Sequence, residues 1–437
     1  MFWKKKEPKT ISDLVDYLLF QEEAGKSSWN GFLNDEALPK NSPPSLSPGK
    51  TEEAPTIFHD QKSSHYFWWG GLLLPITAAR GHFLYVGTTN AGKSQLLGIT
   101  LSQLLQTVSP GSDRRAIIFD TKGDVMEILS GLNIPFTLMN INDKRAASWD
   151  LAKDCQSYTK ADEISFIFIP SDKHGDPFWS NAARAIFSGV IFSFIYRHGA
   201  DWGLHDVVNA LLSDKETLIN ILSQFPQNQA VIDKLLSTEA SKTEAGIQMQ
   251  LFTAVKRLIP AAAHSQRAKR KFSLKDFLLR NDILVISPDL EARETVNPIA
   301  QAMLRRMTDF INASNDSDTR QTFVFIDEAR FLGKLPGLID LVTFGRSKGA
   351  CVFISTQVVE GFYELYGKDE TEEIFGNCNF KSILKANSPV TAQWATQLFG
   401  SVEVYETVIN SQEGKSGLSV SRNKQRIKIN EISSAFV

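Results

Sequence analysis

The sequence is poor in cysteine, has almost no net charge and lacks a long uncharged apolar run, and each absence excludes a class of protein. Its 437 residues include three cysteines, Cys155, Cys351 and Cys378, which lie far apart. They show neither C-x-x-C nor metal-ligand spacing, which excludes a disulfide framework and a zinc module and indicates reduced thiols in a cytosol. The formal net charge is −2. No global basic field therefore points to nucleic acid, although a local positive surface, such as a channel in a ring, is compatible with this balance.

Export signals and membrane spans are also missing from the pattern. The lysines at 4–6 are not followed by a clean apolar core, so no secretory signal is predicted. No segment offers about eighteen uncharged apolar residues, so no membrane span is predicted. The nearest candidates, 66–75 and 185–196, are too short and are interpreted as a strand or turn and as a buried helix. An apolar content of 42% and a charged content of 22% are typical of a soluble globular protein.

A phosphate-binding loop is predicted at 87–94, between an apolar run at 82–86 and a helical apolar stripe. The pattern there is G-x-x-x-x-G-K-S, whose glycines let backbone amides turn inward around an anion at a helix N-terminus. Lys93 is placed to reach the β- and γ-phosphates and the Ser94 hydroxyl to bind Mg²⁺. The alternative, a glycine turn with an exposed lysine, leaves the order of strand, loop and helix unexplained. The predicted nucleotide-binding residues are Gly87, Thr88, Thr89, Asn90, Ala91, Gly92, Lys93, Ser94 and Gln95.

The order of the remaining patterns predicts an α/β fold. Strand, loop, helix and strand follow one another from 82 to 120, which is a βαβ unit, so the sheet is expected to be mainly parallel. From about 172 to 271 strand patterns vanish and helical periods dominate. We therefore expect an all-α domain, 172–271, inserted into a nucleotide-binding domain. Further buried strands are expected at 283–286, 322–326, 350–354 and 380–385, and helices at 178–196, 205–212, 215–224, 229–237, 244–259 and 390–399.

The domain boundaries follow from these changes of pattern. The nucleotide-binding domain is expected to comprise 61–171 and 272–437. Residues 1–60 are predicted to form an appendage, with an amphipathic helix at 11–19 followed by a proline-rich linker. We expect this helix to dock on the chain's own body; a partner or a membrane surface is the alternative.

A second cluster of candidate catalytic residues ends two later strands. Asp327 and Glu328 follow the apolar run 323–326. Asp327 is predicted to hold Mg²⁺ through water beside Ser94, and Glu328 to orient and deprotonate an attacking water. Gln357 ends the next strand, where a polar residue can contact the γ-phosphate or its water. Two exposed acids at a strand end are the alternative, but the phosphate loop upstream favours the catalytic role.

Arg346 lies between these two strands, in Gly-Arg-Ser-Lys-Gly. We interpret it as an arginine finger that reaches the γ-phosphate held by a neighbouring subunit. A surface arginine in a helix-to-strand turn is the alternative.

A GTPase has to be weighed against an ATPase, because 120–123 fits D-x-x-G. Readers of guanine also need N-K-x-D after a strand, and only Thr-Lys-Ala-Asp at 159–162 approaches it, after a polar stretch. With Asp327, Glu328 and Gln357 on later strands, ATP with Mg²⁺ is the better prediction.

Several segments outside the phosphate loop resemble one family, the type IV secretion coupling ATPases, which are TraD/TraG-like conjugative DNA pumps. The most specific is I-D-E-A-R-F-L-G-K-L-P at 326–336, continuing through 345–349 to Gln357. The resemblance runs from about residue 81 to residue 400. The other segments that carry it are 119–124, 148–151, 176–179 with 183–184, 365–367 and 398–400.

The resemblance implies a RecA-like P-loop fold with an inserted all-α domain, hexameric rings and ATP hydrolysis. It also implies DNA or protein substrates passed to a secretion channel, with channel or relaxosome proteins as partners. Relatives usually begin with transmembrane helices, whereas this chain starts polar and ends soon after 426–432. We therefore expect a cytoplasmic protein whose membrane association is peripheral or supplied by a partner.

Residues and resemblance together predict an ATPase motor that moves DNA in conjugative transfer. Two alternatives stay open. One is an ATP-gated adaptor that recruits a secretion substrate without hydrolysis, against which the intact Lys93, Asp327 and Glu328 argue. The other is a soluble DNA translocase or helicase outside secretion.

Overall fold

The computed structural model of the chain describes residues 65–171, 176–236, 242–287 and 293–399, and two further strands at 404–409 and 420–425. The predicted appendage at 1–60, with its amphipathic helix, lies outside the described residues. The two further strands, β12 (Val404–Ile409) and β13 (Val420–Gln425), pair antiparallel.

A seven-stranded sheet forms the centre of the molecule, in the order β11-β3-β10-β9-β4-β8-β5. Every pairing in it is parallel, which confirms the predicted α/β class. The strands predicted from apolar runs occur within two residues of their expected bounds. They are β3 (Phe83–Val86), β4 (Arg114–Phe119), β8 (Ile283–Ile286), β9 (Gln321–Ile326), β10 (Ala350–Thr356) and β11 (Phe380–Ile383). The remaining strand, β5 (Thr137–Met139), was not predicted.

The central strands are buried on both faces, as parallel strands with helices on each side must be. Alternate residues enter two hydrophobic clusters, one on each side of the sheet. One cluster contains the stacked rings of Phe380, Phe83, Phe353 and Phe325, whose centroids lie 4.5, 4.9 and 4.4 Å apart in that order. These rings come from four neighbouring strands, so their packing fixes the strand register.

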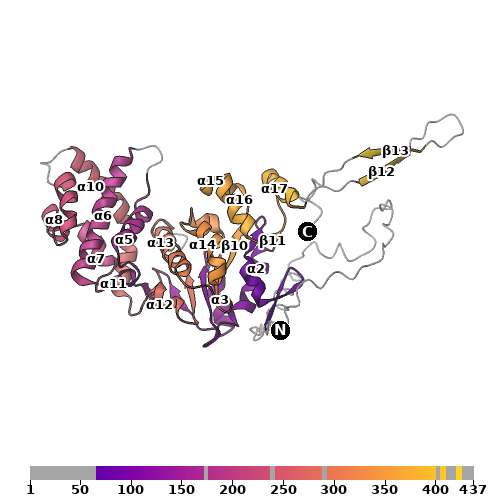
Figure 1. Ribbon diagram of the computed structural model, residues 1–437, viewed down its shortest axis with the longest axis horizontal. Helices are drawn as coiled ribbons and strands as arrows, with labels where there is room; N and C mark the ends of the chain where they lie inside the picture. The colour runs from indigo at the N-terminus through magenta and orange to yellow at the C-terminus, as the bar shows by residue number, and fades with distance from the viewer. Residues whose placement is uncertain are drawn as a thin grey trace, which may run out of the picture.

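Helices cover both faces of the sheet (Figure 1). On the face with the phenylalanine stack lie α2 (Lys93–Leu105) and α3 (Asp124–Gly131). The other face carries α13 (Arg293–Asn312), α14 (Leu338–Phe344), α15 (Glu360–Tyr366), α16 (Lys368–Asn377) and α17 (Pro389–Phe399).

A group of helices gathers at one end of the molecule, away from α2 (Figure 1). It shares one hydrophobic cluster with a face of the sheet. Because α5, which precedes residue 172, packs on α6, the predicted division at 172 and 271 stays a prediction. The group comprises α5 (Tyr158–Phe168), α6 (Pro177–His198), α7 (Leu204–Leu211), α8 (Lys215–Leu222), α9 (Gln229–Val231), α10 (Lys242–Val255) and α11 (Ile259–Arg267).

Short elements complete the described chain. Near the start, Phe67 and Leu74 of a hairpin point into the core, and Gly70 and Gly71 form its turn with positive φ. The short strands and helices are β1 (Tyr66–Trp69), β2 (Leu72–Pro75), β6 (Ser148–Trp149), β7 (Lys271–Phe272), α4 (Leu151–Asp154) and α12 (Leu274–Leu278). The 3₁₀ helices are η3 (Ile76–Gly81), η4 (Pro226–Asn228), η6 (Lys256–Leu258), η8 (Ala329–Leu332) and η9 (Gly345–Lys348). One element, η5 (Ile232–Leu236), is a π-helix.

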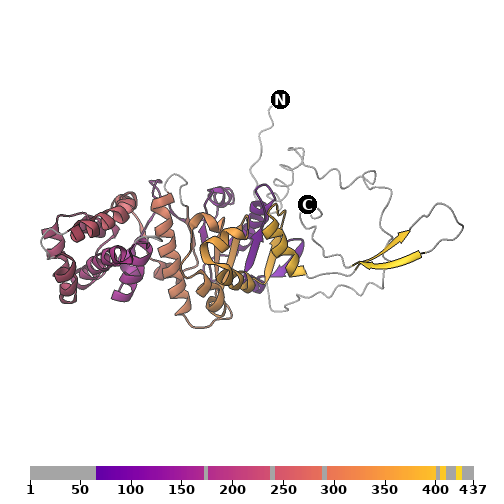
Figure 2. The same ribbon diagram turned by 90° about the horizontal axis from the view of Figure 1, so that it is seen from above.

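Two long helices, α6 and α13, differ in what they pack against. α6 is long and apolar enough by composition to cross a membrane, but 61% of its apolar window is buried inside the protein, so it is a core helix as predicted for 185–196. α13 contacts both α5 and α14, and Figure 2 shows a long helix of its colour standing between the helical group and the sheet. The sequence pattern did not predict α13.

Candidate active site

The predicted site residues converge because of the strand order. β3, β10, β9 and β4 are neighbours in the sheet and run parallel. The segments that follow their last residues therefore lie side by side at one edge, which is the usual ligand edge of an open α/β sheet. These segments begin at Gly87, Gln357, Asp327 and Asp120.

The phosphate loop is held by its two neighbouring strands. The Gly87 N–H donates to the Thr356 carbonyl at 3.2 Å, and the Thr88 N–H donates to the Lys385 carbonyl at 2.9 Å. A Cβ at position 87 would lie 2.8 Å from the Leu384 Cβ, so only glycine fits there. Gly92 has φ +82, which glycine adopts without strain.

The start of α2 is suited to an anion. Gly92 caps the helix without a side-chain hydrogen bond, and no acidic residue occupies the first turn. The first N–H groups of the helix therefore face outward with the positive end of the helix dipole. Ala91 N–H donates to the Thr88 carbonyl at 3.2 Å, which closes the loop around this point.

Lys93 is nearly buried at the head of α2 and faces Glu328. Its side chain is 5% exposed, and Nζ lies 3.9 Å from the Glu328 Oε2. Burial lowers the pKa of Lys93, an effect that the Glu328 carboxylate opposes. The ammonium thus stands between the helix start and the predicted general base, where a terminal phosphate is expected.

The Lys122 side chain lies between Ser94 and Asp327, the two predicted Mg²⁺ ligands. The sequence did not predict this contact. The Lys122 ammonium donates to the Ser94 Oγ at 3.0 Å and lies 3.5 Å from the Asp327 Oδ2. Asp327 Oδ1 is buried and has no hydrogen-bond partner among the described residues. Hard oxygen ligands with an unused carboxylate oxygen fit Mg²⁺. The one sequence signal for this contact of Lys122 is its position two residues after Asp120, which places it at the same edge of the sheet.

Other metal sites are not evident in the described ranges, which contain no group of three or more histidine, cysteine, aspartate or glutamate side chains placed to hold an ion. This agrees with Mg²⁺ that takes most of its ligands from phosphates and water.

Glu328, Gln357 and Thr89 form a chain of hydrogen bonds. The Gln357 amide nitrogen donates to the Glu328 Oε2 at 3.0 Å, and the Thr89 hydroxyl donates to the Gln357 Oε1 at 3.4 Å. Glu328 itself has a left-handed backbone, with φ 50 and ψ 61. The chain ties the predicted base to the phosphate loop and orients its carboxylate.

The D-x-x-G segment has a structural role beside the site. Asp120 accepts hydrogen bonds from the N–H groups of Gly123 at 2.9 Å and Val125 at 3.1 Å, so it closes the turn that begins α3. Burial raises the pKa of Asp120 to about 6, although its backbone hydrogen bonds oppose that shift. Lys160, from the segment that approaches N-K-x-D, lies in α5 and pairs with Asp309 at 2.8 Å, so it does not face this edge.

Arg346 lies at the opposite edge of the sheet, in the turn η9 that precedes β10. β10 has seven residues, so the two edges are roughly 20 Å apart. Arg346 is exposed, and no carboxylate of the described residues lies within ion-pair distance of it. Burial lowers the pKa of the neighbouring His82 to about 4, and the charge of Arg346 adds to this shift. Within one chain, Arg346 is thus separated from Lys93 and Glu328.

A model of one protein family matches most of the chain. Its description is type IV secretion-system coupling protein DNA-binding domain, and it matches residues 67–431. Coupling protein TraD of Escherichia coli (strain K12) is 25% identical over 331 residues, which are 74% of this chain and 44% of TraD. The chain therefore spans less than half of the length of that relative.

Solved structures show the same fold. The bacterial conjugative coupling protein TrwBdeltaN70, in an unbound form, has a TM-score of 0.67 at 19% identity, over 86% of this chain and 84% of that one. The plasmid coupling protein TrwB in complex with ADP and Mg²⁺ has a TM-score of 0.65 at 20% identity, over 78% of this chain and 80% of that one.

Proposed function

Because this chain belongs to the type IV secretion-system coupling protein family, we propose that it is an ATP-hydrolysing motor that binds DNA and moves it toward a secretion channel. The observation that carries the proposal is the convergence of Lys93, Glu328 and Gln357 with the Ser94–Asp327 pair at one sheet edge. TrwB, which shares the fold, is described in complex with ADP and Mg²⁺ and with analogues of ATP and GTP.

Each residue then has a separate task. The loop amides and Lys93 bind the phosphates, and Ser94 and Asp327 hold Mg²⁺, which when bound neutralises charge on the transferring phosphoryl group. Glu328 accepts the proton of the attacking water, and Gln357 keeps its carboxylate oriented. Lys122 occupies the position between Ser94 and Asp327 that Mg²⁺ would take, and its ammonium would supply positive charge beside the bound ion.

The nucleotide is proposed to be ATP. The D-x-x-G carboxylate at Asp120 is used by the backbone of its own turn, and Lys160 is held in α5 by Asp309. Neither is therefore free to read guanine. Equal turnover of GTP and ATP would contradict this choice.

We also propose a ring, of six subunits as the family resemblance implies, because the predicted arginine finger lies away from the candidate site within one chain. Arg346 is exposed without an acidic partner among the described residues, at the edge opposite to the phosphate loop. A neighbouring subunit that presents this edge to the phosphate loop would supply the arginine finger. The proposed location is the cytoplasm, with membrane contact peripheral or through a partner, and the proposed partners are DNA and channel or relaxosome proteins.

Steady-state phosphate release tests the proposal, measured with ATP alone, with single-stranded DNA and with double-stranded DNA, beside native mass under the same conditions. We expect DNA to stimulate turnover in an assembled species, and Lys93→Ala to abolish it. Nucleotide-dependent binding of a secretion substrate without any turnover would favour the ATP-gated adaptor instead. Turnover with DNA stimulation but no effect on transfer in cells would favour a translocase outside secretion.

A further inference from the structure

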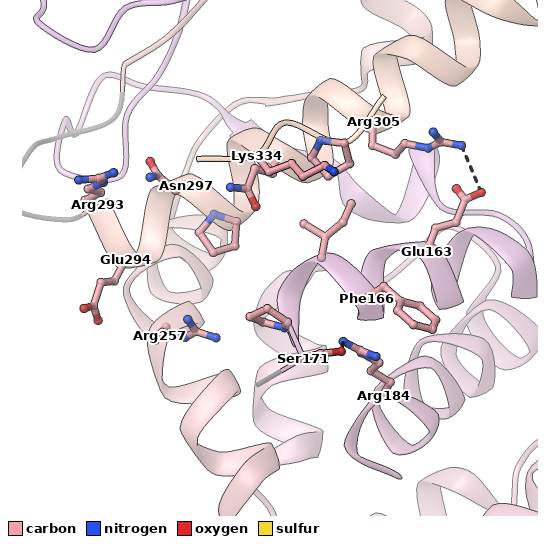
Figure 3. A pocket seen from close by; sticks show the side chains of 15 residues that line it. Glu163, Phe166, Ser171, Arg184, Arg257, Arg293, Glu294, Asn297, Arg305 and Lys334 are labelled. Atoms are coloured by element: carbon pink, nitrogen blue, oxygen red, sulfur yellow. Dashed lines mark hydrogen bonds and ion pairs between the residues drawn. The ribbon is translucent and has the colours of Figure 1, made fainter. Parts of the chain in front are cut away.

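A large cavity separates the helical group from the nucleotide-binding part of the chain (Figure 3). Its volume is about 930 Å³, which is at the upper end of the range for ligand sites. One wall comes from α5, the start of α6 and η6, and the other from α13 and the segment 334–336. The candidate active site does not contribute to it.

Five cationic side chains line this interdomain cavity; two of them are ion-paired and a third is hydrogen-bonded to neutral groups. The Arg305 guanidinium lies 2.9 Å from Asp340, and the Lys334 ammonium lies 2.9 Å from Glu370. Arg184 donates to the Ser171 hydroxyl at 2.8 Å and to the Ile169 carbonyl at 2.8 Å. These three therefore have structural partners that explain their presence.

Like Arg184, the other two cations, Arg257 and Arg293, have no carboxylate within ion-pair distance among the described residues, and they make fewer hydrogen bonds than Arg184 does. Arg257 makes one long hydrogen bond, at 3.5 Å, to the Phe168 carbonyl, while its Nε is buried and has no partner within the described ranges. Figure 3 shows the Arg257 side chain pointing into the space between the walls and Arg293 at the rim. Arg293 is exposed and lies over the Phe331 ring, with its guanidinium carbon 4.6 Å from the ring centroid. Arg257 is half-buried, and a half-buried guanidinium without a counter-charge is costly. Among the described residues, the counter-charge that Arg257 needs is therefore missing.

Neighbouring groups indicate what else the missing ligand carries. Phe166 is 51% exposed, and the Arg184 guanidinium carbon lies 4.2 Å from its ring centroid, an arrangement on which a flat ring can stack. Asn297 donates to the Phe331 carbonyl at 2.8 Å, while its Oδ1 is buried and unpartnered among the described side chains. That oxygen needs an N–H donor.

We propose that the interdomain cavity binds a segment of single-stranded DNA, with phosphates at Arg257 and Arg293 and a base beside Phe166. Phosphate, aromatic ring and N–H donor occur together in a nucleotide unit, and stacking platforms beside cationic groups are the usual design for unpaired strands. Glu163 and Glu294 also line the cavity, but Glu163 is paired with Lys160 at 2.9 Å, and Glu294 points away at the rim (Figure 3). The proposal deepens the proposed function and rests on it only for the identity of the strand.

The cavity wall is connected to the candidate base. Besides the Asn297 bond to Phe331, the Gln301 amide donates to the Leu332 carbonyl at 2.7 Å. Both acceptors belong to η8, which starts directly after Glu328. DNA bound in the cavity would contact α13, and α13 is hydrogen-bonded to the turn that follows Glu328. Occupancy of the cavity is therefore expected to change the rate of hydrolysis.

Fluorescence anisotropy of the full chain with a labelled oligothymidylate of about 15 nucleotides tests the proposal in the absence of ATP. We expect Arg257→Gln and Arg293→Gln each to weaken binding roughly tenfold, because each removes a charge-assisted contact. The matched controls are Lys256→Gln, beside Arg257, and Arg280→Gln. Both residues are exposed and neither lines the cavity, so changes below about twofold are expected.

Folding is monitored in the same variants. Arg257→Gln removes an unpaired guanidinium, so its midpoint of thermal unfolding should match or exceed that of the wild type. The oligonucleotide should raise that midpoint in the wild type, as any ligand of the folded state does, and should raise it less in Arg257→Gln.

Four results would overturn the proposal. The first is an equal loss of oligonucleotide affinity in the cavity variants and the controls, and the second is no loss of affinity in either. The third is competition by a decaglutamate peptide that is as strong as competition by unlabelled oligonucleotide. The fourth is a loss of inorganic phosphate binding in the cavity variants while their oligonucleotide binding is unchanged. The same measurements distinguish a failure of this proposal from a failure of the proposed function. If DNA binding depends on Arg257 but the protein does not hydrolyse ATP, only the motor function is contradicted. If DNA stimulates hydrolysis but its binding does not depend on Arg257, only the cavity proposal is contradicted.

Discussion

The candidate active site and the interdomain cavity both gather cationic side chains, but only one of them balances its charge internally. At the active site, Lys93 faces Glu328 at 3.9 Å and Lys122 faces Asp327 at 3.5 Å. In the cavity, Arg257 and Arg293 face no carboxylate of the described residues. The first arrangement keeps its shape without a ligand, because each charge already has a partner.

The two sites make different demands on a ligand. At the active site a nucleotide must separate existing pairs, so its own Mg²⁺ and phosphates have to replace them one for one. In the cavity a ligand only adds the missing negative charge. At the active site, removing one charged side chain should therefore leave its ion-pair partner without a counter-charge. In the cavity, removing one arginine should only reduce the affinity for the ligand. The following variants test the active-site half of this comparison.

Lys93→Ala should have the largest effect. It removes the phosphate-facing ammonium and leaves the Glu328 carboxylate facing the phosphates without its cation, so ATP binding should weaken at least about 100-fold. Titration with a fluorescent ATP analogue measures the loss. Lys368→Ala, at an exposed lysine, is the control and should bind as the wild type does. Wild-type hydrolysis in Lys93→Ala would refute the site.

Arg346→Ala tests whether the active site's charges are complete within one chain. If a neighbour supplies this arginine, ATP binding stays near normal while turnover falls about 10³-fold. Mixing Arg346→Ala with Lys93→Ala subunits should recover some activity, because a hybrid interface then holds one intact Lys93 and one intact Arg346.

Two controls accompany that experiment. Lys348→Ala alters the same turn but removes a lysine paired with Asp316 at 2.7 Å, so its turnover should change little. Arg346→Lys should rescue little, because a point charge lacks the planar fork of arginine. Full activity of assembled Arg346→Ala would leave the arginine as a turn residue and the charge set complete in one chain.

Glu328→Gln should separate binding from chemistry. The amide keeps the shape of the side chain but cannot accept the proton of water, so turnover should fall roughly 10²- to 10⁴-fold. Affinity for Mg·ATP should persist, because the lost negative charge lies close to phosphates. Single-turnover kinetics alongside equilibrium binding distinguish the two. A collapse of affinity with normal turnover per bound nucleotide would assign Glu328 a different role.

Lys122→Met should have the smallest effect, and in the opposite direction. Because Lys122 lies between Ser94 and Asp327, Mg²⁺ has to displace it, and its removal should tighten binding of Mg²⁺ alone about threefold to tenfold. Thermal shift against Mg²⁺ concentration measures this. Lys122→Arg, which keeps the charge, should behave as the wild type does. Weaker Mg²⁺ binding in Lys122→Met would mean that the lysine supports the metal site.

Much of the fold was predictable because its signals are local. Apolar runs such as 283–286 and 350–354 mark strands buried on both faces, and the loop at 87–94 fixes where a strand ends and a helix begins. The family suggested by residues 326–336 is confirmed. By contrast, α13 was not predicted: its mean composition is polar and Pro298 interrupts its pattern, although its apolar stripe is buried between the sheet and the helical group.

The candidate site was predictable residue by residue and in the placement of Asp327 beside Ser94, but its further contacts were not. Lys93, Asp327 and Glu328 follow from motifs, whereas the neighbours of each strand depend on the order β3-β10-β9-β4, which no local pattern encodes. Lys122 was missed for this reason, since it meets Ser94 and Asp327 only through that order. The roles assigned to these residues, and the boundaries of the helical domain, remain predictions for the experiments above.

The backbone conformation of Glu328 lowers the stability of the folded protein at the position of the predicted general base. A left-handed conformation, with φ 50, costs a residue with a Cβ about 1–2 kcal/mol relative to its preferred conformations. Glycine would adopt it freely, so Glu328→Gly should raise the midpoint of thermal unfolding while removing the carboxylate. The strain at Glu328 is therefore a cost to folding that the side chain offsets only if its carboxylate is used.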